Sequence, residues 1–458
     1  MTIDHGSLAG LLGEWLPRQR WFGGKGRSIV ALDVESDVRL VDGDPALHDV
    51  VLRVSYGSSR GPGEIEHYQL LLGIRGESGE RLEHALIGVL DGRYVHDAAY
   101  DTELTAGMLR LLADSGKADA ITFTSVRELD PTLPSRVLSS EQSNTSLVYG
   151  DDYILKVFRK VAPGINPDLE IVRALDEVGC EHIAKPLGWI EGTVEDEPAT
   201  LGLMQEYLRF GTEGWSLALT SVRDLYAEGD LHADEVGGDF AAEAERLGLA
   251  TAAVHHDLVT AFGVETADRG RVAALAGAMT SRLEAACEVV PELREHAPAL
   301  RATYDQLGEQ QPPIRIQRIH GDFHLGQAMR TESGWVLIDF EGEPARPLQE
   351  RRRKMSPLRD VAGMLRSFDY AARQLLTEQP SHLNLAYRAA EWAERNREAF
   401  CDGYARGSGH DPRDEGPLLR AFELDKAVYE VVYEARNRPT WLPIPLGSIE
   451  RLVGEAHD

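Results

Sequence analysis

Short apolar runs separated by polar turns predict that the first part of the chain is built mainly from strands. Residues 31–34, 50–54 and 85–89 are β-branched or aliphatic runs of strand length. Residues 137–159 read as three further strands divided by polar turns. Residues 199–208 form an apolar run that passes into a linker, as a buried strand would. The pattern therefore indicates a β-rich N-terminal part.

Apolar residues at helical spacing dominate from Ser221 onward. Residues 240–258 and 422–438 show this spacing over several turns. A shorter helix is predicted over residues 166–179, because an Asn-Pro pair suits a helix start and a glycine follows the last turn. The fold class predicted from these patterns is α+β, with a mainly helical C-terminal part.

Composition and charge narrow the classes of function. The chain has 458 residues, 43% hydrophobic and 27% charged, which suggests two or three domains with a sizeable core. Its net charge of −27 argues against nucleic acid or an anionic membrane as a partner. No apolar run approaches the roughly 20 residues of a membrane helix, and the N-terminus does not resemble a signal peptide. Because its three cysteines are also far apart, we expect a cytoplasmic protein without disulfides, either a monomer or a weak homo-oligomer.

The stretch of residues 318–342 carries the candidate chemistry. A four-residue turn signal divides two short strands, and Asp339 falls where the second strand ends. Asp322 lies in the loop before the first strand, beside Gly321, which permits a tight backbone. Gln327 follows five residues after Asp322 and offers an amide oxygen to the same region. Two carboxylates and an amide are thus predicted to lie close together.

These groups are typical of phosphoryl transfer from ATP. Asp322 is predicted to position the attacking hydroxyl and accept its proton, while Asp339 and Gln327 are predicted to bind Mg²⁺. His320 and His324 have the spacing of a zinc pair, but they lie in a glycine-broken loop without an HExxH motif or a Cys partner. We therefore expect His320 to hydrogen-bond the loop backbone and His324 to lie near the substrate.

A candidate ATP phosphate site lies upstream. Lys156 lies between apolar neighbours on a predicted strand, as the lysine that holds ATP phosphates does in kinases. The segment 142–145, which includes Ser143, stands where a loop would cover these phosphates, although it lacks glycines. Glu170, on the following helix, is the predicted ion-pair partner of Lys156. Taken alone, Lys156 also fits a solvated lysine on the face of a sheet.

The linker after the run 199–208 is the expected hinge between two lobes. Gln205, Glu206 and Tyr207 are predicted to supply backbone hydrogen bonds to the adenine of ATP. Further along, His255 and His256 are predicted to be capping or surface histidines.

Two motifs resemble the catalytic and metal loops of the aminoglycoside and choline kinase superfamily, namely HGDFHLGQ and IDFEG. Gln327 stands where asparagine is usual, which is a feature of maltokinases, and LPRQRWFGGKGR near the N-terminus also resembles that family. The resemblance implies a bilobal eukaryotic-like kinase fold. Residues 1–90 would form a cap subdomain, 91–204 the kinase N-lobe and 205–458 the C-lobe. It also implies that Asp360 braces the catalytic loop.

The acceptor site is expected on the predicted helix 422–438. Lys426, Glu430 and Tyr433 fall on one face of it, although an exposed charged face explains the same spacing. In maltokinases the acceptor pocket is built on such a helix. That resemblance adds Arg438 to the candidates.

The resemblance implies that ATP phosphorylates maltose at its C1 hydroxyl, giving maltose 1-phosphate for α-glucan synthesis. One alternative is an aminosugar or aminoglycoside kinase, whose cationic acceptor should require several acidic residues in the pocket. The other is a nucleotide-binding pseudokinase, which would be expected to lack Lys156, Asp322 or Asp339, whereas all three are present.

Overall fold

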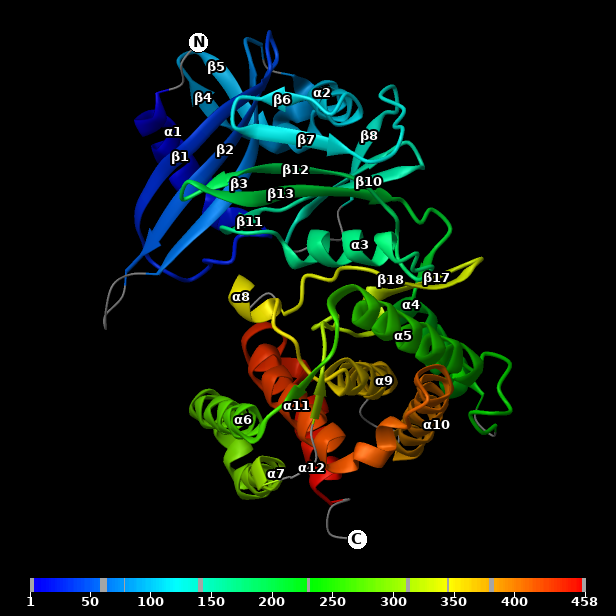
Figure 1. Ribbon diagram of the computed structural model, residues 1–458. Helices are drawn as coiled ribbons and strands as arrows, with labels where there is room; N and C mark the ends of the chain where they lie inside the picture. Colours follow the sequence, from blue (N-terminus) through cyan, green and yellow to red (C-terminus); the bar gives the residue numbers. More distant parts are fainter. Residues whose placement is uncertain are drawn as a thin grey trace. The chain divides into compact units, whose positions relative to one another are not determined.

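The structure is a computed structural model that describes residues 4–57, 64–77, 79–138, 143–228, 231–309, 314–343, 346–378 and 383–454 (Figure 1). The chain divides into two compact units. Unit 1 comprises residues 1–173 and 184–209, and unit 2 comprises residues 174–183 and 210–458. No helix in the described ranges is long and apolar enough to cross a membrane.

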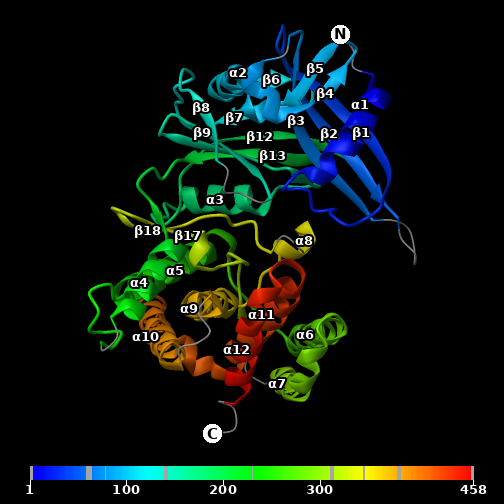
Figure 2. The same ribbon diagram turned by 180° about the vertical axis from the view of Figure 1, so that it is seen from behind.

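Unit 1 begins with an antiparallel sheet, and one helix packs on a face of this sheet (Figure 2). The helix α1 (His5–Trp15) starts at Asp4, whose carboxylate accepts a hydrogen bond from the backbone of Ser7, and continues into η1 (Leu16–Arg18). It packs Leu8 and Leu12 into the sheet core. The strands, in spatial order, are β1 (Ile29–Val41), β2 (Ala46–Tyr56), β3 (Ile65–Arg75), β5 (Arg93–Asp97) and β4 (Leu86–Leu90), with η2 (Glu80–Ala85) and η3 (Ala98–Tyr100) beside them.

A second antiparallel sheet completes unit 1. Its strands, in spatial order, are β6 (Lys117–Ala118), β7 (Ile121–Ser125), β12 (Pro186–Val194), β13 (Glu197–Glu206), β10 (Tyr153–Val157), β9 (Thr145–Tyr149) and β8 (Ser135–Leu138). The helix α2 (Thr102–Ala113) contacts β7 and β8. The helix α3 (Pro167–Glu177) starts as predicted, because the side chain of Asn166 accepts a hydrogen bond from the backbone of Asp168.

Arg159 joins the two sheets of unit 1. It precedes β11 (Lys160–Val161), which pairs with β3 of the first sheet. Its buried guanidinium binds both oxygens of Asp97 at 2.8 and 3.1 Å and donates to Thr145 of β9 at 2.7 Å. It also stacks on the ring of Trp21, from the LPRQRWFGGKGR segment. The first sheet is thus fastened to the strand pair that carries Lys156.

Unit 2 is mainly helical and includes a small β-hairpin that packs against α4 and α5. The hairpin strands β17 (Ala328–Thr331) and β18 (Gly334–Leu337) form a sheet with β14 (Thr212–Glu213). A second small sheet pairs β15 (Glu265–Ala267) with β16 (Ile314–Ile316). The helices are α4 (Gly214–Ala227), α5 (Ala241–Phe262), α6 (Arg269–Val289), η4 (Pro291–Glu295), α7 (Ala297–Glu309), η5 (Leu325–Gln327), α8 (Leu348–Arg351), α9 (Leu358–Glu378), α10 (Leu383–Ser408), η6 (Pro412–Glu415), α11 (Gly416–Asn437), η7 (Pro439–Trp441) and α12 (Pro443–Gly454).

The observed fold confirms the predicted class, with β-rich and helical parts in the expected order. The first sheet continues beyond residue 90 to Asp97, and β13 runs through residue 204. Both expected boundaries therefore fall within sheets. The helix expected over residues 240–258 is longer, because α5 ends only at Gly263, whose φ of 71° stops it.

Asp49 in the first sheet should make stability depend on pH. Its side chain is buried and accepts a 2.6 Å hydrogen bond from Gln69, and burial raises its pKa to about 7, while Arg159 opposes and Asp37 adds to this shift. A raised pKa in the folded state stabilises the protein fully below the unfolded pKa, and this contribution is lost as pH rises through about 7. We expect Asp49→Asn to flatten the fall in melting temperature between pH 4 and 7. An unchanged slope in calorimetric scans would contradict this assignment.

Candidate active site

The loop that carries Asp322 is held by the first turn of α9. One carboxylate oxygen of buried Asp360 accepts the backbone N–H of His320 at 2.8 Å, and the other accepts that of Gly321 at 2.9 Å. His255 also hydrogen-bonds Asp360 at 2.9 Å, and its other ring nitrogen bonds the hydroxyl of Tyr404. Asp360 thus braces the loop as expected. His255 is buried behind the loop, which corrects its assignment as a capping or surface histidine.

The two loop histidines are engaged by backbone groups. His320 donates from Nε2 to the carbonyl of Ile338 at 2.9 Å, and the backbone N–H of Asp322 donates to its Nδ1 at 3.4 Å. His324 begins η5, where its Nδ1 accepts the N–H of Gly326 at 3.0 Å, and burial lowers its pKa. Neither histidine belongs to the one metal-competent cluster found among the described residues.

Gln327 and Asp339 are neighbours, as predicted. The amide Nε2 of Gln327 donates to Oδ2 of Asp339 at 3.0 Å, and the backbone of Ile338 bonds the carbonyl of Gln327. Asp339 has a φ of 65°, a left-handed conformation that costs a non-glycine residue on the order of 1–3 kcal/mol. Strain of this kind marks positions where the surrounding structure fixes a functional side chain.

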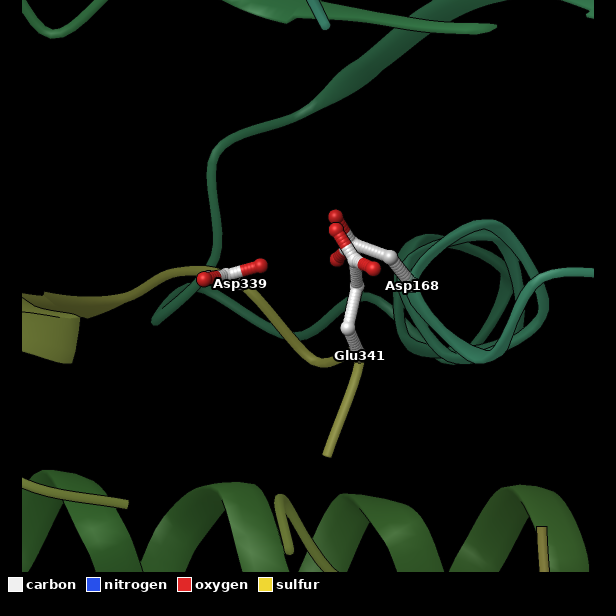
Figure 3. Close-up of side chains that lie close together, drawn as sticks. All are labelled: Asp168, Asp339 and Glu341. Atoms are coloured by element: carbon white, nitrogen blue, oxygen red, sulfur yellow. The ribbon is translucent and has the colours of Figure 1, made fainter. Parts of the chain in front are cut away.

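Glu341 adds a second carboxylate to this loop. It lies on the same segment as Asp339 after β18 (Figure 3), and one oxygen of each lies within 4.8 Å of the other. Sequence reasoning missed Glu341, although residues two positions apart share a side in extended backbone. Carboxylate and amide oxygens are hard ligands of the kind that Mg²⁺ accepts, so this donor set fits that ion.

Gly321, in the loop that carries Asp322, also lies close to Gly342, in the segment that carries Asp339. A Cβ on Gly321 would lie 3.3 Å from the Cα of Gly342, and its φ is 89°. Only glycine meets both conditions without strain.

Lys156 of unit 1 has an acidic partner on α3, but the residue is Asp168. Its Nζ lies 2.9 Å from Oδ2 of Asp168, which is fully buried in the first turn of α3 (Figure 3). Glu170, the predicted partner, lies two residues further along the same helix, and its pairing with Lys156 stays a prediction.

The predicted adenine segment has two backbone N–H groups that already have partners in unit 1. The backbone N–H of Glu206 already donates to Lys185, and that of Tyr207 donates to Asp152 at 2.8 Å. The side chain of Gln205 donates to the carbonyl of Ala184. The adenine contacts of Gln205, Glu206 and Tyr207 therefore stay a prediction. Ser143 lies just before β9, and Gln142 lies outside the described residues.

A pocket of about 260 Å³ in unit 2 contains Asp322. Nζ of Lys426 lies 2.8 Å from Oδ1 of Asp322 and 3.6 Å from Glu343. The pocket therefore brings the predicted proton acceptor and one predicted acceptor-site residue together. Its walls come from the catalytic loop, the segment around α8, and helices α6, α9 and α11; the lining residues are Arg282, Gly321, Asp322, Phe323, Glu343, Arg346, Pro347, Glu350, Arg359, Gly363, Phe422, Asp425, Lys426 and Tyr429.

The remaining acceptor candidates lie outside this pocket. The face of α11 that lines it carries Phe422, Asp425, Lys426 and Tyr429. With 100° of rotation per residue, the centre of this face lies roughly 60° around the helix axis from the face predicted by Lys426, Glu430 and Tyr433. These candidates are His324, Glu430, Tyr433 and Arg438; His324 caps η5, half-buried Glu430 pairs with buried Arg366 at 2.7 Å, Tyr433 is exposed, and Arg438 binds Glu434 at 2.7 Å.

Comparison with known proteins agrees with this architecture. Residues 15–101 match the maltokinase N-terminal cap domain. The chain is 29% identical to a glucosamine kinase of Streptacidiphilus jiangxiensis over 71% of this chain and 75% of that protein. It is 28% identical to a glucosamine kinase of Mycolicibacterium smegmatis, over 70% of this chain and 80% of that protein.

Solved structures share the fold. A glucosamine kinase in one crystal form superposes with a TM-score of 0.73 at 22% identity, covering 100% of this chain and 98% of the other. A glucosamine kinase in complex with glucosamine, ADP and inorganic phosphate gives a TM-score of 0.69 at 22% identity, covering 99% and 100%. Residues 135–410, more than half of the chain, match the phosphotransferase enzyme family. The chain therefore belongs to that phosphotransferase family.

Proposed function

We propose that the chain transfers the γ-phosphate of ATP to a hydroxyl group of an amino sugar. The observation that carries the choice of acceptor is the charge pattern of the pocket beside Asp322. Its cations Arg282, Arg346, Arg359 and Lys426 are each paired with a carboxylate of the same pocket. Glu350 is exposed at the pocket and has no ion-pair partner among the described residues. A cationic amine would therefore find a carboxylate there, and the two glucosamine kinases that resemble the chain support this choice.

Each residue has a role in the proposed reaction. Asp322 would orient the acceptor hydroxyl and accept its proton. Lys156, aimed by Asp168, would bind ATP phosphates. Asp339, Gln327 and Glu341 would hold Mg²⁺. When bound, this ion would neutralise phosphate charge.

The proposal includes a cytoplasmic location. The use of ATP supports it.

Maltose is a second candidate acceptor. The match of residues 15–101 to the maltokinase cap domain favours it, as does the LPRQRWFGGKGR segment. The reaction would then take place at the C1 hydroxyl and give maltose 1-phosphate.

An acceptor panel tests the proposal. The protein is assayed with ATP and Mg²⁺ against glucosamine, glucose, maltose and kanamycin, and ³¹P NMR identifies the phosphorylated position. We expect kcat/KM for glucosamine to exceed that for glucose at least tenfold, which corresponds to about 1.4 kcal/mol. Glu350→Gln should reduce that ratio while leaving glucose turnover in place.

The other outcomes decide between the remaining functions. Preferred turnover of maltose to an anomeric phosphate would support the second candidate. Nucleotide binding without transfer to any sugar in the panel would support the pseudokinase alternative.

A further inference from the structure

The geometry points to Lys426 as a positioning residue that orients the carboxylate of Asp322, and not as a group that binds the sugar. The inference rests on the proposed function, because it concerns the proton acceptor of that reaction. Lys426 is held on three sides: Nζ lies 2.8 Å from Oδ1 of Asp322, 3.6 Å from Glu343 and 4.9 Å from the ring centre of Tyr429. Its side chain is only 18% exposed. An ammonium in such surroundings has little freedom to follow a ligand.

Glu343 fixes Lys426 from behind. This carboxylate is 6% exposed and contacts three cations: Arg346 at 2.5 Å, Arg359 at 3.0 Å and Lys426 at 3.6 Å. Three cations within 3.6 Å compensate the charge of this buried carboxylate. Arg359 precedes Asp360, the residue that holds the catalytic loop by two backbone hydrogen bonds. The same turn of α9 therefore fixes both the loop backbone and, through Glu343 and Lys426, the Asp322 side chain.

The hydrogen-bonding capacity of the groups supports a positioning role. An ammonium has three donors: one bonds Asp322 at 2.8 Å, and the ion-pair contact with Glu343 at 3.6 Å holds the ammonium on another side. Lys426 occupies Oδ1 of Asp322, which leaves Oδ2 to accept the hydrogen bond of a substrate hydroxyl. A charge-assisted bond at 2.8 Å limits rotation of the carboxylate. The orientation of Oδ2 is therefore fixed before the acceptor binds.

The proposed reaction gives no role to Glu343, the last residue of the acidic segment that follows Asp339. The sequence after Asp339 reads Phe-Glu-Gly-Glu, and its last residue is Glu343. Because the segment that carries Asp339 ends in the carboxylate that anchors Lys426, the metal-binding loop and the proton acceptor are joined through one lysine. Losing that lysine should therefore lower the rate of transfer more than the affinity for the acceptor.

Lys426→Ala tests the inference through the split between kcat and KM. We expect kcat to fall by about 10²-fold, the effect of a misplaced catalytic group, with the acceptor KM changed less than threefold. Methylammonium or ethylammonium should restore part of kcat, because the pocket reaches Lys426 and the added cation can replace Nζ beside Asp322. Lys426→Arg, which keeps the charge, should retain more activity than Lys426→Ala.

Arg397→Met is the matched control. Arg397 is half-buried and pairs at 2.6 Å with buried Glu423, which lies on α11 like Lys426 but outside the pocket. Its loss should lower the melting temperature without reducing kcat comparably and without rescue by alkylammonium ions. A tenfold or greater rise in acceptor KM at near-normal kcat in Lys426→Ala would make Lys426 a sugar ligand and overturn the inference. A fall in kcat without rescue, matched by Arg397→Met, would overturn it as well.

The rate of slow ATP hydrolysis by the protein distinguishes failure of this inference from failure of the proposed function. Wild-type protein that hydrolyses ATP but phosphorylates no sugar in the panel would refute the proposed acceptor. The Lys426 variants would then be judged by their hydrolysis rates, because water would be the group that Asp322 orients. Wild-type protein with neither activity would refute both.

Discussion

Asp322→Asn is expected to reduce kcat by about 10²–10⁴-fold while nucleotide affinity stays within a few-fold of the wild type. The substitution keeps the size of the side chain but removes the carboxylate that would accept the proton of the acceptor hydroxyl. It also removes the charge partner of Lys426, which lies at 2.8 Å. Asp339, Gln327 and Lys156 are unchanged, so metal and phosphate binding should remain.

Coupled assays with saturating ATP and acceptor measure the loss of turnover, and calorimetric titration measures nucleotide binding. Asp411→Asn is a suitable control, because Asp411 pairs with Arg413 in a solvent-exposed turn of unit 2. Its turnover should be close to that of the wild type. If Asp322→Asn kept turnover within tenfold of the wild type, another group would have to be the proton acceptor.

The groups that could be predicted from the sequence are those whose neighbours are close along the chain. Asp322, Gln327 and Asp339 lie within 18 residues in a loop and a hairpin. Turn signals and strand length were therefore enough to place Gln327 beside Asp339. The hydrogen bond between Gln327 and Asp339 at 3.0 Å confirms that part of the prediction.

The positions that the sequence could not decide depend on which side of a helix faces its surroundings. Asp168 and Glu170 both lie in the first turn of α3, and sequence alone offered no means to choose between them. The same is true of α11, where half-buried Glu430 pairs with buried Arg366. That pair joins residues 64 positions apart, and a contact of this range leaves no local signal.

The acceptor pocket illustrates the same limit. Arg282, Glu343 and Asp425 come from three distant segments, and each resembles an ordinary surface charge in the sequence. His255 was assigned to the surface because it lies near the end of a predicted helix. In the fold it is buried, because Asp360 and Tyr404 supply partners for both ring nitrogens.

Asp339→Asn is expected to abolish Mg²⁺-dependent use of ATP, with kcat/KM for ATP lowered by at least about 10²-fold. Asparagine tolerates the left-handed backbone found here, with φ of 65°, better than alanine does, so the change isolates the loss of charge from backbone strain. The neutral amides of Gln327 and of the introduced asparagine would leave only Glu341 as a charged ligand on this loop. Such a set competes poorly with water for Mg²⁺, which keeps its hydration shell tightly.

Asp339→Gly tests the same metal-binding role while it relieves the backbone strain at this position. Glycine adopts a φ of 65° without strain, so this variant should melt at a temperature equal to or above that of the wild type while losing metal-dependent activity. Titration of Mg²⁺ at fixed ATP, followed by calorimetry and by turnover, measures both variants. Equal Mg·ATP affinity in the wild type, Asp339→Asn and Asp339→Gly would show that Asp339 holds no metal. The strained conformation would then have to be explained by the contacts of the loop itself.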